Sequence, residues 1–398
     1  MVIGSSTRVR WRCLTAIMAM ILVTSGVCAI VPPVLADTAP RFSIEIRPEM
    51  ELLAGVLAQT DWIVTRGPRG DGNIYYRALK DYLAPYKDHP AVQIAQKLTK
   101  QGFAYDAPPA VICHFGPLPN LELKYEYSDY LIKRAGSRQV LEEFRLALKD
   151  LAEKSKFHEF VAQWQGDSDS WTKAGYVDGD RVMDWLEGFF GTKMQESHII
   201  LAPAMFPAGG YGATVTGKDG ETIAFQIIRE DGTSTMQPQF QGGGSLNSLT
   251  LHEWGHSFVN PTLGKYDKEI QKLNYLFIPV SIPMFRQAYN SVEVFMNEQV
   301  LRALTSLAAG EMGTSEDMER EIVYNERRSF YLTRDLVTIL REYESSRDRY
   351  PTFEAFTPVM VNRLMEMHPP RFWQRWLTER NLIIATALLM VLVLYIIA

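Results

Sequence analysis

The first half of the chain places its apolar residues at the three- and four-residue spacing of amphipathic helices. The first helix is expected after Pro48, because proline suits the first turn of a helix. Its apolar positions are Met50, Leu53, Val56 and Leu57. Shorter helices are expected over 74–86 and 91–103, and Ser137 can cap a longer one. The apolar stripe of that longer helix is Leu141, Phe144, Leu148 and Leu151.

Further along the chain the pattern changes to short apolar runs that are typical of strands. Three such runs occupy 198–201, 211–216 and 222–228. The sequence Gly-Lys-Asp-Gly over 217–220 predicts a hairpin turn between the last two runs. The Gly-, Ser- and Asp-rich stretch 166–170 is expected to be a loop. A small antiparallel sheet is therefore predicted immediately before the segment that carries the candidate chemistry.

The N-terminus has the pattern of an export signal. Arg8, Arg10 and Arg12 precede an uncharged apolar stretch over 14–31. Small residues at the end of Val-Leu-Ala then suit a signal peptidase, so cleavage is expected after Ala36. The alternative is an uncleaved membrane anchor. The prediction is a signal peptide over residues 1–36 and an exported mature chain.

The C-terminus is a second apolar run, over 382–398, without charge or proline. Its length is at the lower limit of the about 17–25 residues that span a bilayer. A C-terminal transmembrane helix is therefore predicted over 381–398, with the preceding domain outside the cytoplasm at the cell envelope. Basic residues just before this run can contact anionic lipid head groups; they are Arg371, Arg375 and Arg380.

Composition and charge describe an ordinary globular chain of 398 residues, with 41 Lys+Arg against 46 Asp+Glu and a net charge of −5. This mildly acidic balance lacks the basic character of a nucleic-acid-binding protein, so no nucleic-acid partner is expected. Two of the three cysteines, Cys13 and Cys28, fall in the predicted signal peptide. Cys113 is then alone, so no disulfide can form within the mature chain.

The segment 247–259 is the most informative part of the sequence, and it is predicted to form a helix. Asn247 or Ser245 can cap its start, and the Asn-Pro pair at 260–261 is expected to end it. Its residues are Asn-Ser-Leu-Thr-Leu-His-Glu-Trp-Gly-His-Ser-Phe-Val.

The chemistry of this helix comes from the pattern His-Glu-x-x-His. His252 and His256 are four residues apart, so both imidazoles project from one face about a turn apart. That spacing suits two corners of a tetrahedral Zn²⁺ site. Glu253 follows the first histidine and can act as general base on a water at the metal. The chain has only seven histidines, and two of them occur in this pattern.

A catalytic zinc site needs a third protein ligand and keeps its fourth position for water. The chain lacks the Gly and His that metzincins place soon after the second histidine, and His368 is expected at the surface. An acid is the better candidate. Glu298 is favoured because it lies in a predicted helix anchored by apolar residues, whereas Asp267 and Glu269 belong to a charged run and Glu293 lacks this context.

These residues resemble the gluzincin clan of zinc metallopeptidases, typified by thermolysin. The resemblance rests on His252-Glu253-Trp254-Gly255-His256 and on Asn297-Glu298. It implies a zincin-like fold and a glutamate third ligand on a second helix, with the segment around 265–290 looped out as an insertion. More broadly, the chain resembles a bacterial family described only as a domain of unknown function. That match includes His-Ser-Phe-Val-Asn-Pro after the motif glycine, Glu298-x-x-x-Arg302-Ala303 and Tyr350-Pro351-Thr352-Phe353.

The predicted fold class is α+β: a small antiparallel sheet beside the metal-binding helix, mostly helices elsewhere, and a C-terminal transmembrane helix. The domain organisation follows from these elements. It comprises a signal peptide over 1–36, a mainly helical region over 37–195, a zincin-like catalytic region over 196–370 and a membrane anchor over 381–398.

The leading functional hypothesis is a zinc-dependent peptidase that hydrolyses peptide or protein substrates outside the cytoplasm. Its metal ligands would be His252, His256 and Glu298, with Glu253 as general base. The alternative is a non-catalytic, zinc-stabilised, membrane-anchored binding module, against which the presence of the general base argues. A di-iron carboxylate site is disfavoured, because it needs a second Glu-x-x-His.

Substrate, cleavage position and oligomeric state stay open at the level of sequence. An oxyanion-stabilising group is expected in peptidases of this type. The candidates are Tyr324, Arg328 and Tyr331, which follow the Glu298 helix.

Overall fold

The computed structural model describes residues 42–369 apart from five short gaps. The gaps are 69–70, 175–176, 206–209, 231–235 and 241–243. The predicted signal peptide over 1–36 and the predicted anchor over 381–398 both lie outside the described residues.

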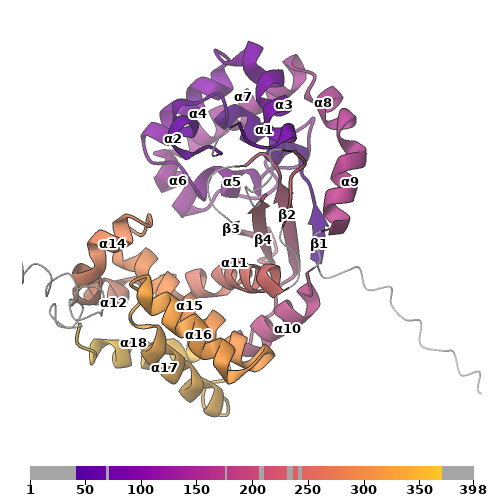
Figure 1. Cartoon of the computed structure of the whole chain (residues 1–398). Coiled ribbons are helices and arrows are strands. Elements are labelled where there is room, and N and C mark those ends of the chain that lie inside the picture. The colour runs from indigo at the N-terminus through magenta and orange to yellow at the C-terminus, as the bar shows by residue number, and fades with distance from the viewer. Residues whose placement is uncertain are drawn as a thin grey trace, which may run out of the picture. The chain divides into compact units, whose positions relative to one another are not determined.

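A short strand and a series of helices make up the N-terminal part (Figure 1). They are β1 (Phe42–Glu45), α1 (Pro48–Leu57), α2 (Asp61–Arg66), α3 (Ile74–Leu83), η1 (Ala84–Tyr86), α4 (Pro90–Lys100), α5 (Ala107–Ile112), α6 (Asp129–Ala135), α7 (Arg138–Lys154), α8 (Phe157–Gln163) and α9 (Gln165–Ala174). The four predicted helices are present, and the Ser137 side chain caps α7 by accepting from Val140 N at 3.3 Å. The predicted loop over 166–170 is wrong, because these residues belong to α9, which also carries the buried Trp171.

The chain continues through α10 (Gly179–Phe190) into the strands β2 (Glu196–Ala202), β3 (Gly210–Thr216) and β4 (Thr222–Arg229). The sheet has the order β1-β2-β4-β3. Only β3 and β4 are antiparallel, joined by the predicted hairpin, whereas β1 with β2 and β2 with β4 are parallel.

The predicted antiparallel sheet is therefore wrong, and the sheet is mixed. The local sequence pattern predicts the β3–β4 hairpin but carries no information about the partner of β2, which is distant in the chain. The burial of the strands agrees with their parallel pairing. β2 and β4 are buried along most of their length, as expected for parallel strands that are covered on both faces.

Alternate residues of the central strands enter two different cores. Ile200 of β2 and Phe225 of β4 pack with side chains from α1 to α9. Leu201 and Ala224 pack instead with side chains from α10 and the helices that follow β4. The sheet thus lies between two sets of helices (Figure 1). Cys113 is buried in the first core as a free thiol.

The remainder of the described chain is helical. Its elements are α11 (Gly244–Gly264), α12 (Asp267–Lys272), α13 (Asn274–Phe277), η2 (Ile278–Val280), α14 (Ser281–Phe285), α15 (Val292–Met312), α16 (Ser315–Arg327), α17 (Thr333–Ser345) and α18 (Phe353–Met365). The segment 265–290, predicted to be looped out, instead forms the short helices α12 to α14. These are held to the core by the fully buried Leu273, Leu276 and Met284.

The predicted fold class needs a second correction, at its transmembrane element. No helix in the described part of the chain combines the length and apolarity that crossing a membrane requires. The described structure therefore does not support the predicted transmembrane helix, whose segment 381–398 lies outside the described residues. The fold is α+β, mostly helical with a small mixed sheet.

Candidate metal centre

Helix α11 carries both motif histidines and is anchored from its opposite side. Trp254 is fully buried and contacts Phe42 of β1 edge to face, with ring centroids 6.1 Å apart. His252 and His256 remain partly exposed. The helix continues past the Asn-Pro pair at 260–261, where the sequence predicted its end, because Leu263 in its last turn is buried in the core. The histidines therefore sit within a long, packed helix and not at a frayed end.

Helix α15 brings Glu298 to the face of α11 that carries the histidines. Ser291 caps this helix by accepting from Val294 N at 3.2 Å. The two helices approach closely at Gly255, where an added Cβ would lie 2.5 Å from Leu301 Cδ1. The motif glycine thus leaves room for the Leu301 side chain where the helix of the histidines meets the helix of Glu298.

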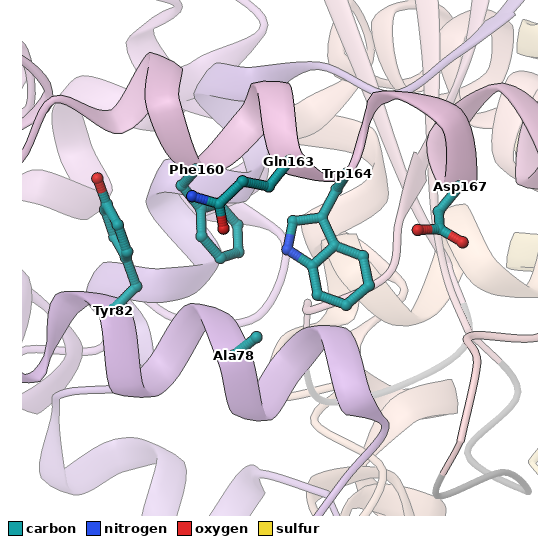
Figure 2. A pocket seen from close by; sticks show the side chains of 6 residues that line it. All are labelled: Ala78, Tyr82, Phe160, Gln163, Trp164 and Asp167. Atoms are coloured by element: carbon teal, nitrogen blue, oxygen red, sulfur yellow. The ribbon is translucent and has the colours of Figure 1, made fainter.

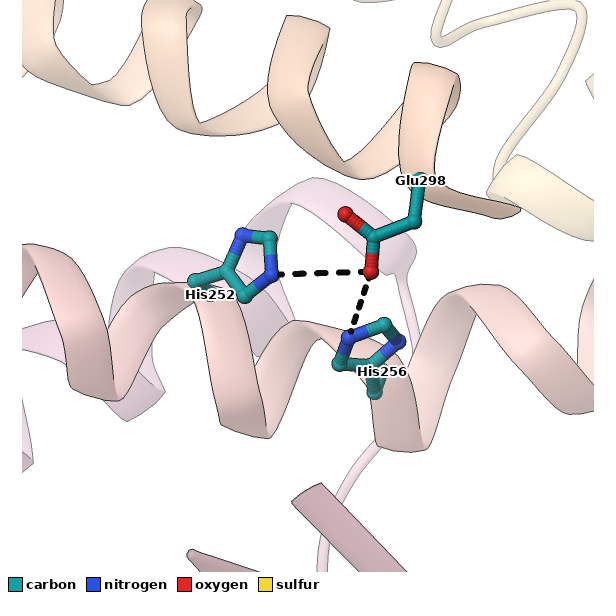
Figure 3. A group of neighbouring side chains, drawn as sticks. All are labelled: His252, His256 and Glu298. Atoms are coloured by element: carbon teal, nitrogen blue, oxygen red, sulfur yellow. Dashed lines mark ion pairs between the residues drawn. The ribbon is translucent and has the colours of Figure 1, made fainter. Parts of the chain in front are cut away.

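The three side chains converge on one point (Figure 3). Glu298 Oε1 lies 3.3 Å from His256 Nε2 and 3.8 Å from His252 Nε2. One ligand atom from each residue falls within 4.8 Å of the other two. The three side chains could therefore hold a metal ion. No other group of three such side chains converges in the described part of the chain.

Arg302 holds Glu298 in this orientation. Its Nη2 lies 3.0 Å from Glu298 Oε2, which leaves Oε1 directed at the histidines (Figure 3). The guanidinium is itself fixed, because Nη1 donates to Asn325 Oδ1 at 3.0 Å and Nη2 donates to the Tyr289 hydroxyl at 3.2 Å. It also lies 4.0 Å from the centroid of the Phe330 ring. This partner orients the carboxylate in the way that outer groups orient metal ligands.

His256 has an orienting partner as well. Its Nδ1 lies 3.2 Å from Asn260 Oδ1, one turn further along α11. A hydrogen bond at Nδ1 fixes the ring and leaves Nε2 to face Glu298. Each of these two residues is thus held by a neighbour that does not itself belong to the cluster.

Burial and the carboxylate together set the protonation of this cluster. Burial lowers the pKa of His252 to about 3, which keeps this imidazole neutral. Burial acts in the same direction on His256, but the Glu298 carboxylate outweighs it and raises that pKa to about 9. Burial would raise the pKa of Glu298, yet His252, His256 and Arg302 hold it well below its usual range. A cation at this point would take over the role of the proton on His256.

Glu253 lies beside the cluster, between α11 and β3. Its side chain is buried, and this burial raises its pKa to about 7. The strand β3 presents Gly210 and Gly212 to it, and an added Cβ at Gly212 would lie 2.6 Å from the Glu253 carbonyl oxygen. Thr214 Oγ1 then donates to Ser257 Oγ at 2.7 Å. Glycines in β3 therefore allow the strand to approach α11 at the candidate general base.

Replacing Gly212 by Ala is expected to lower the free energy of unfolding by about 1–3 kcal/mol. The reason is that the new Cβ meets backbone of α11, which cannot rotate away. Thermal or urea unfolding measures the effect. Gly264→Ala is the matched control, because nothing lies within 4 Å of a Cβ added there. Equal stability of the two variants would contradict the close packing of β3 on α11.

The competing acids and the oxyanion candidates have other surroundings. The competing acids Asp267, Glu269 and Glu293 all lie outside the cluster. Asp267 and Glu293 are exposed, and Glu269 is half-buried. The Tyr331 hydroxyl donates to Leu276 O at 2.6 Å, which gives it a structural role. Arg328 donates to Tyr324 at 3.3 Å and is close enough to lower the pKa of His252 further.

The sequence analysis named Arg302 only as part of a family resemblance and did not predict that it, Asn325 and Tyr289 orient the cluster. Arg302 follows Glu298 by one helical turn, and this spacing of opposite charges on an otherwise apolar helix is the signal that could have identified it. Asn325 and Tyr289 lie on other segments, and nothing in their local sequence marks them.

A comparison with known protein families finds one that matches this chain. A family model described as a domain of unknown function (DUF4932) matches residues 69–363, which is more than half of the chain. This span includes the three converging side chains and Glu253. Neither a curated protein nor a solved structure gives a significant match.

Proposed function

The chain belongs to the DUF4932 family, and from its site we propose that it is a zinc-dependent peptidase. The observation that carries the proposal is the convergence of His252 and His256 from one helix with Glu298 from another. Two imidazoles and one carboxylate are the ligand set of catalytic zinc in thermolysin-type enzymes. The gluzincin resemblance of the sequence motif supports the same ligand assignment.

A structural zinc site would be closed by four protein ligands. In the described part of the chain only three ligating side chains converge here, and this matches a catalytic site that keeps one position for water. When bound, zinc would lower the pKa of a water and polarise a carbonyl group. His252, His256 and Glu298 would hold it.

Glu253 supplies the proton transfers in the proposed reaction. Its carboxylate takes a proton from the attacking water and delivers it to the amine that leaves when the peptide bond breaks. The raised pKa of about 7 suits both steps near neutral pH, because the group can accept a proton and give it up again. The backbone of β3 beside Gly212 confines this side chain to the site.

The strand β3 supports a peptide as the substrate. It is an edge strand that pairs only with β4 among the described strands, and it runs directly beside Glu253. An extended peptide can add to such an edge through backbone hydrogen bonds. The predicted signal peptide over 1–36 suggests that these substrates are met outside the cytoplasm.

Metal analysis and a cleavage assay on the purified full chain test this function together. We expect one zinc per chain, with two nitrogens and a carboxylate oxygen around it by zinc-edge spectroscopy. We also expect cleavage within a mixed peptide library, lost on chelation and restored by added zinc. A chain fully loaded with zinc that cleaves no peptide would instead favour the non-catalytic binding module.

A further inference from the structure

A pocket of about 270 Å³ opens on the N-terminal helices, separate from the histidine cluster. It is formed where β1 and α1 meet α3, α8 and α9. Its walls include Ile44, Glu45, Glu51, Tyr75, Trp164 and Ser168. The candidate peptidase site uses none of these residues, so the pocket needs its own explanation.

The notable group in this pocket is the Glu51 carboxylate. Its residue is only 1% exposed, and neither carboxylate oxygen has a partner with full hydrogen-bond geometry among the described residues, although the Tyr75 hydroxyl and the Ala204 backbone N–H lie close enough to act on it. Buried polar atoms without a partner are rare, and a buried charge is costly unless it is paired. Burial raises the pKa of Glu51 to about 8, although the Tyr75 hydroxyl and the Ala204 backbone N–H act in the opposite direction.

Aromatic rings lie next to this carboxylate. Tyr75 is buried and packs edge to face on Trp164 and on Trp171, with ring centroids 5.1 Å and 5.3 Å away. Tyr75 and Trp164 both line the pocket with Glu51. Aromatic faces attract cations, and they do so most strongly where water is excluded.

A second pocket, of about 390 Å³, shares Trp164 and runs between α3 and α8–α9 (Figure 2). Figure 2 shows Tyr82, Phe160 and Trp164 between these helices, with Asp167 at one end. Its walls contain no buried carboxylate without a partner. The charge of a ligand is therefore better matched by the first pocket, beside Glu51.

The other charges around the first pocket leave the Glu51 site negative. The wall contains two further acids, Glu45 and Asp169. Glu45 pairs with Arg47 at 2.7 Å and with His198 at 3.3 Å, and Asp169 accepts a hydrogen bond from Gln165 Nε2 at 3.0 Å. Arg47 is further engaged over the Phe225 ring, at 4.8 Å from its centroid. Glu51 has no such counter-ion among the described residues.

We propose that this pocket binds a small organic cation, a substituted ammonium group, with Glu51 as its counter-ion and the rings of Tyr75 and Trp164 against its methyl or methylene groups. A metal ion fits less well, because Mg²⁺ and Ca²⁺ require six or more oxygen ligands and much of the wall is aromatic and aliphatic. The proposal does not depend on the peptidase activity.

Calorimetric titration of the full chain tests the pocket, with choline and tetramethylammonium as probes and 3,3-dimethylbutanol as the uncharged analogue of choline. We expect saturable binding of the two cations and none of the alcohol. Glu51→Gln should weaken cation binding about tenfold or more, because it removes a desolvated charge. Glu153→Gln, at an exposed glutamate of α7, should bind like the unaltered chain.

Trp164→Leu is a second variant that tests the same pocket at a residue that is only partly buried. It should also weaken cation binding, because the aromatic face is lost, while the zinc content stays unchanged. Equal binding of choline and its uncharged analogue would overturn the proposal. Undiminished binding by folded Glu51→Gln, or the absence of saturable binding by both cations, would do the same.

Discussion

Replacing Glu253 by Gln is expected to lower the rate of peptide hydrolysis by about 100- to 10,000-fold and to leave bound zinc in place. The amide has nearly the shape of the carboxylate but cannot take a proton from the attacking water. The side chain lies beside the ligand cluster and is not one of the three converging groups, so the ligand set stays complete. The change therefore separates the loss of catalysis from the loss of metal.

The measurement pairs zinc content with cleavage of the same peptide in the same preparation. Glu269→Gln is the matched control, because it makes the same chemical change on α12, outside the cluster. It should retain both zinc and activity. If Glu253→Gln keeps its zinc and hydrolyses peptides at the original rate, Glu253 is not the general base and the proposed mechanism fails.

Local spacing predicted the part of the site that depends on one helix. His252 and His256 are one turn apart, and any helix through them places both imidazoles on one face. Trp254, on the opposite side of α11, is fully buried and holds this face toward α15. The sequence therefore predicted the pair correctly as neighbours, without knowledge of the fold.

The rest of the site depends on contacts between distant segments. The sequence favours Glu298 only by eliminating the other nearby acids. In the structure Glu298 lies against the histidines, on a helix whose Leu301 packs closely on Gly255 of α11. The strand β1 was missed, since four half-buried residues carry too little pattern to predict a strand. The parallel pairing of β1 with β2 joins segments that are far apart, which explains the incorrect antiparallel prediction. Periodicity within a segment carries no information on such partners.

Replacing Glu298 by Ala is expected to have two effects at once: loss of stoichiometric zinc and a lower free energy of unfolding even without metal. The first follows because one of three ligands is removed. The second follows because Arg302 is buried and loses its only ion-pair partner in the described part of the chain. Breaking a buried ion pair from one side costs about 3–5 kcal/mol.

The double variant Glu298→Ala with Arg302→Met separates these effects. It removes the stranded charge, so part of the lost stability should return, although Asn325 and Tyr289 lose their donor. Zinc should remain absent. Urea unfolding in the presence of chelator gives the stabilities, and elemental analysis gives the metal content.

Glu293→Ala is the control on the same helix, because Glu293 is exposed and outside the cluster. It should retain both zinc and stability. Retention of zinc by Glu298→Ala would remove Glu298 from the ligand set. A double variant no more stable than the single one would contradict the expected cost of leaving the buried Arg302 charge without its ion-pair partner. The two results are independent, so the experiment tests the role of Glu298 as metal ligand separately from its role as partner of Arg302.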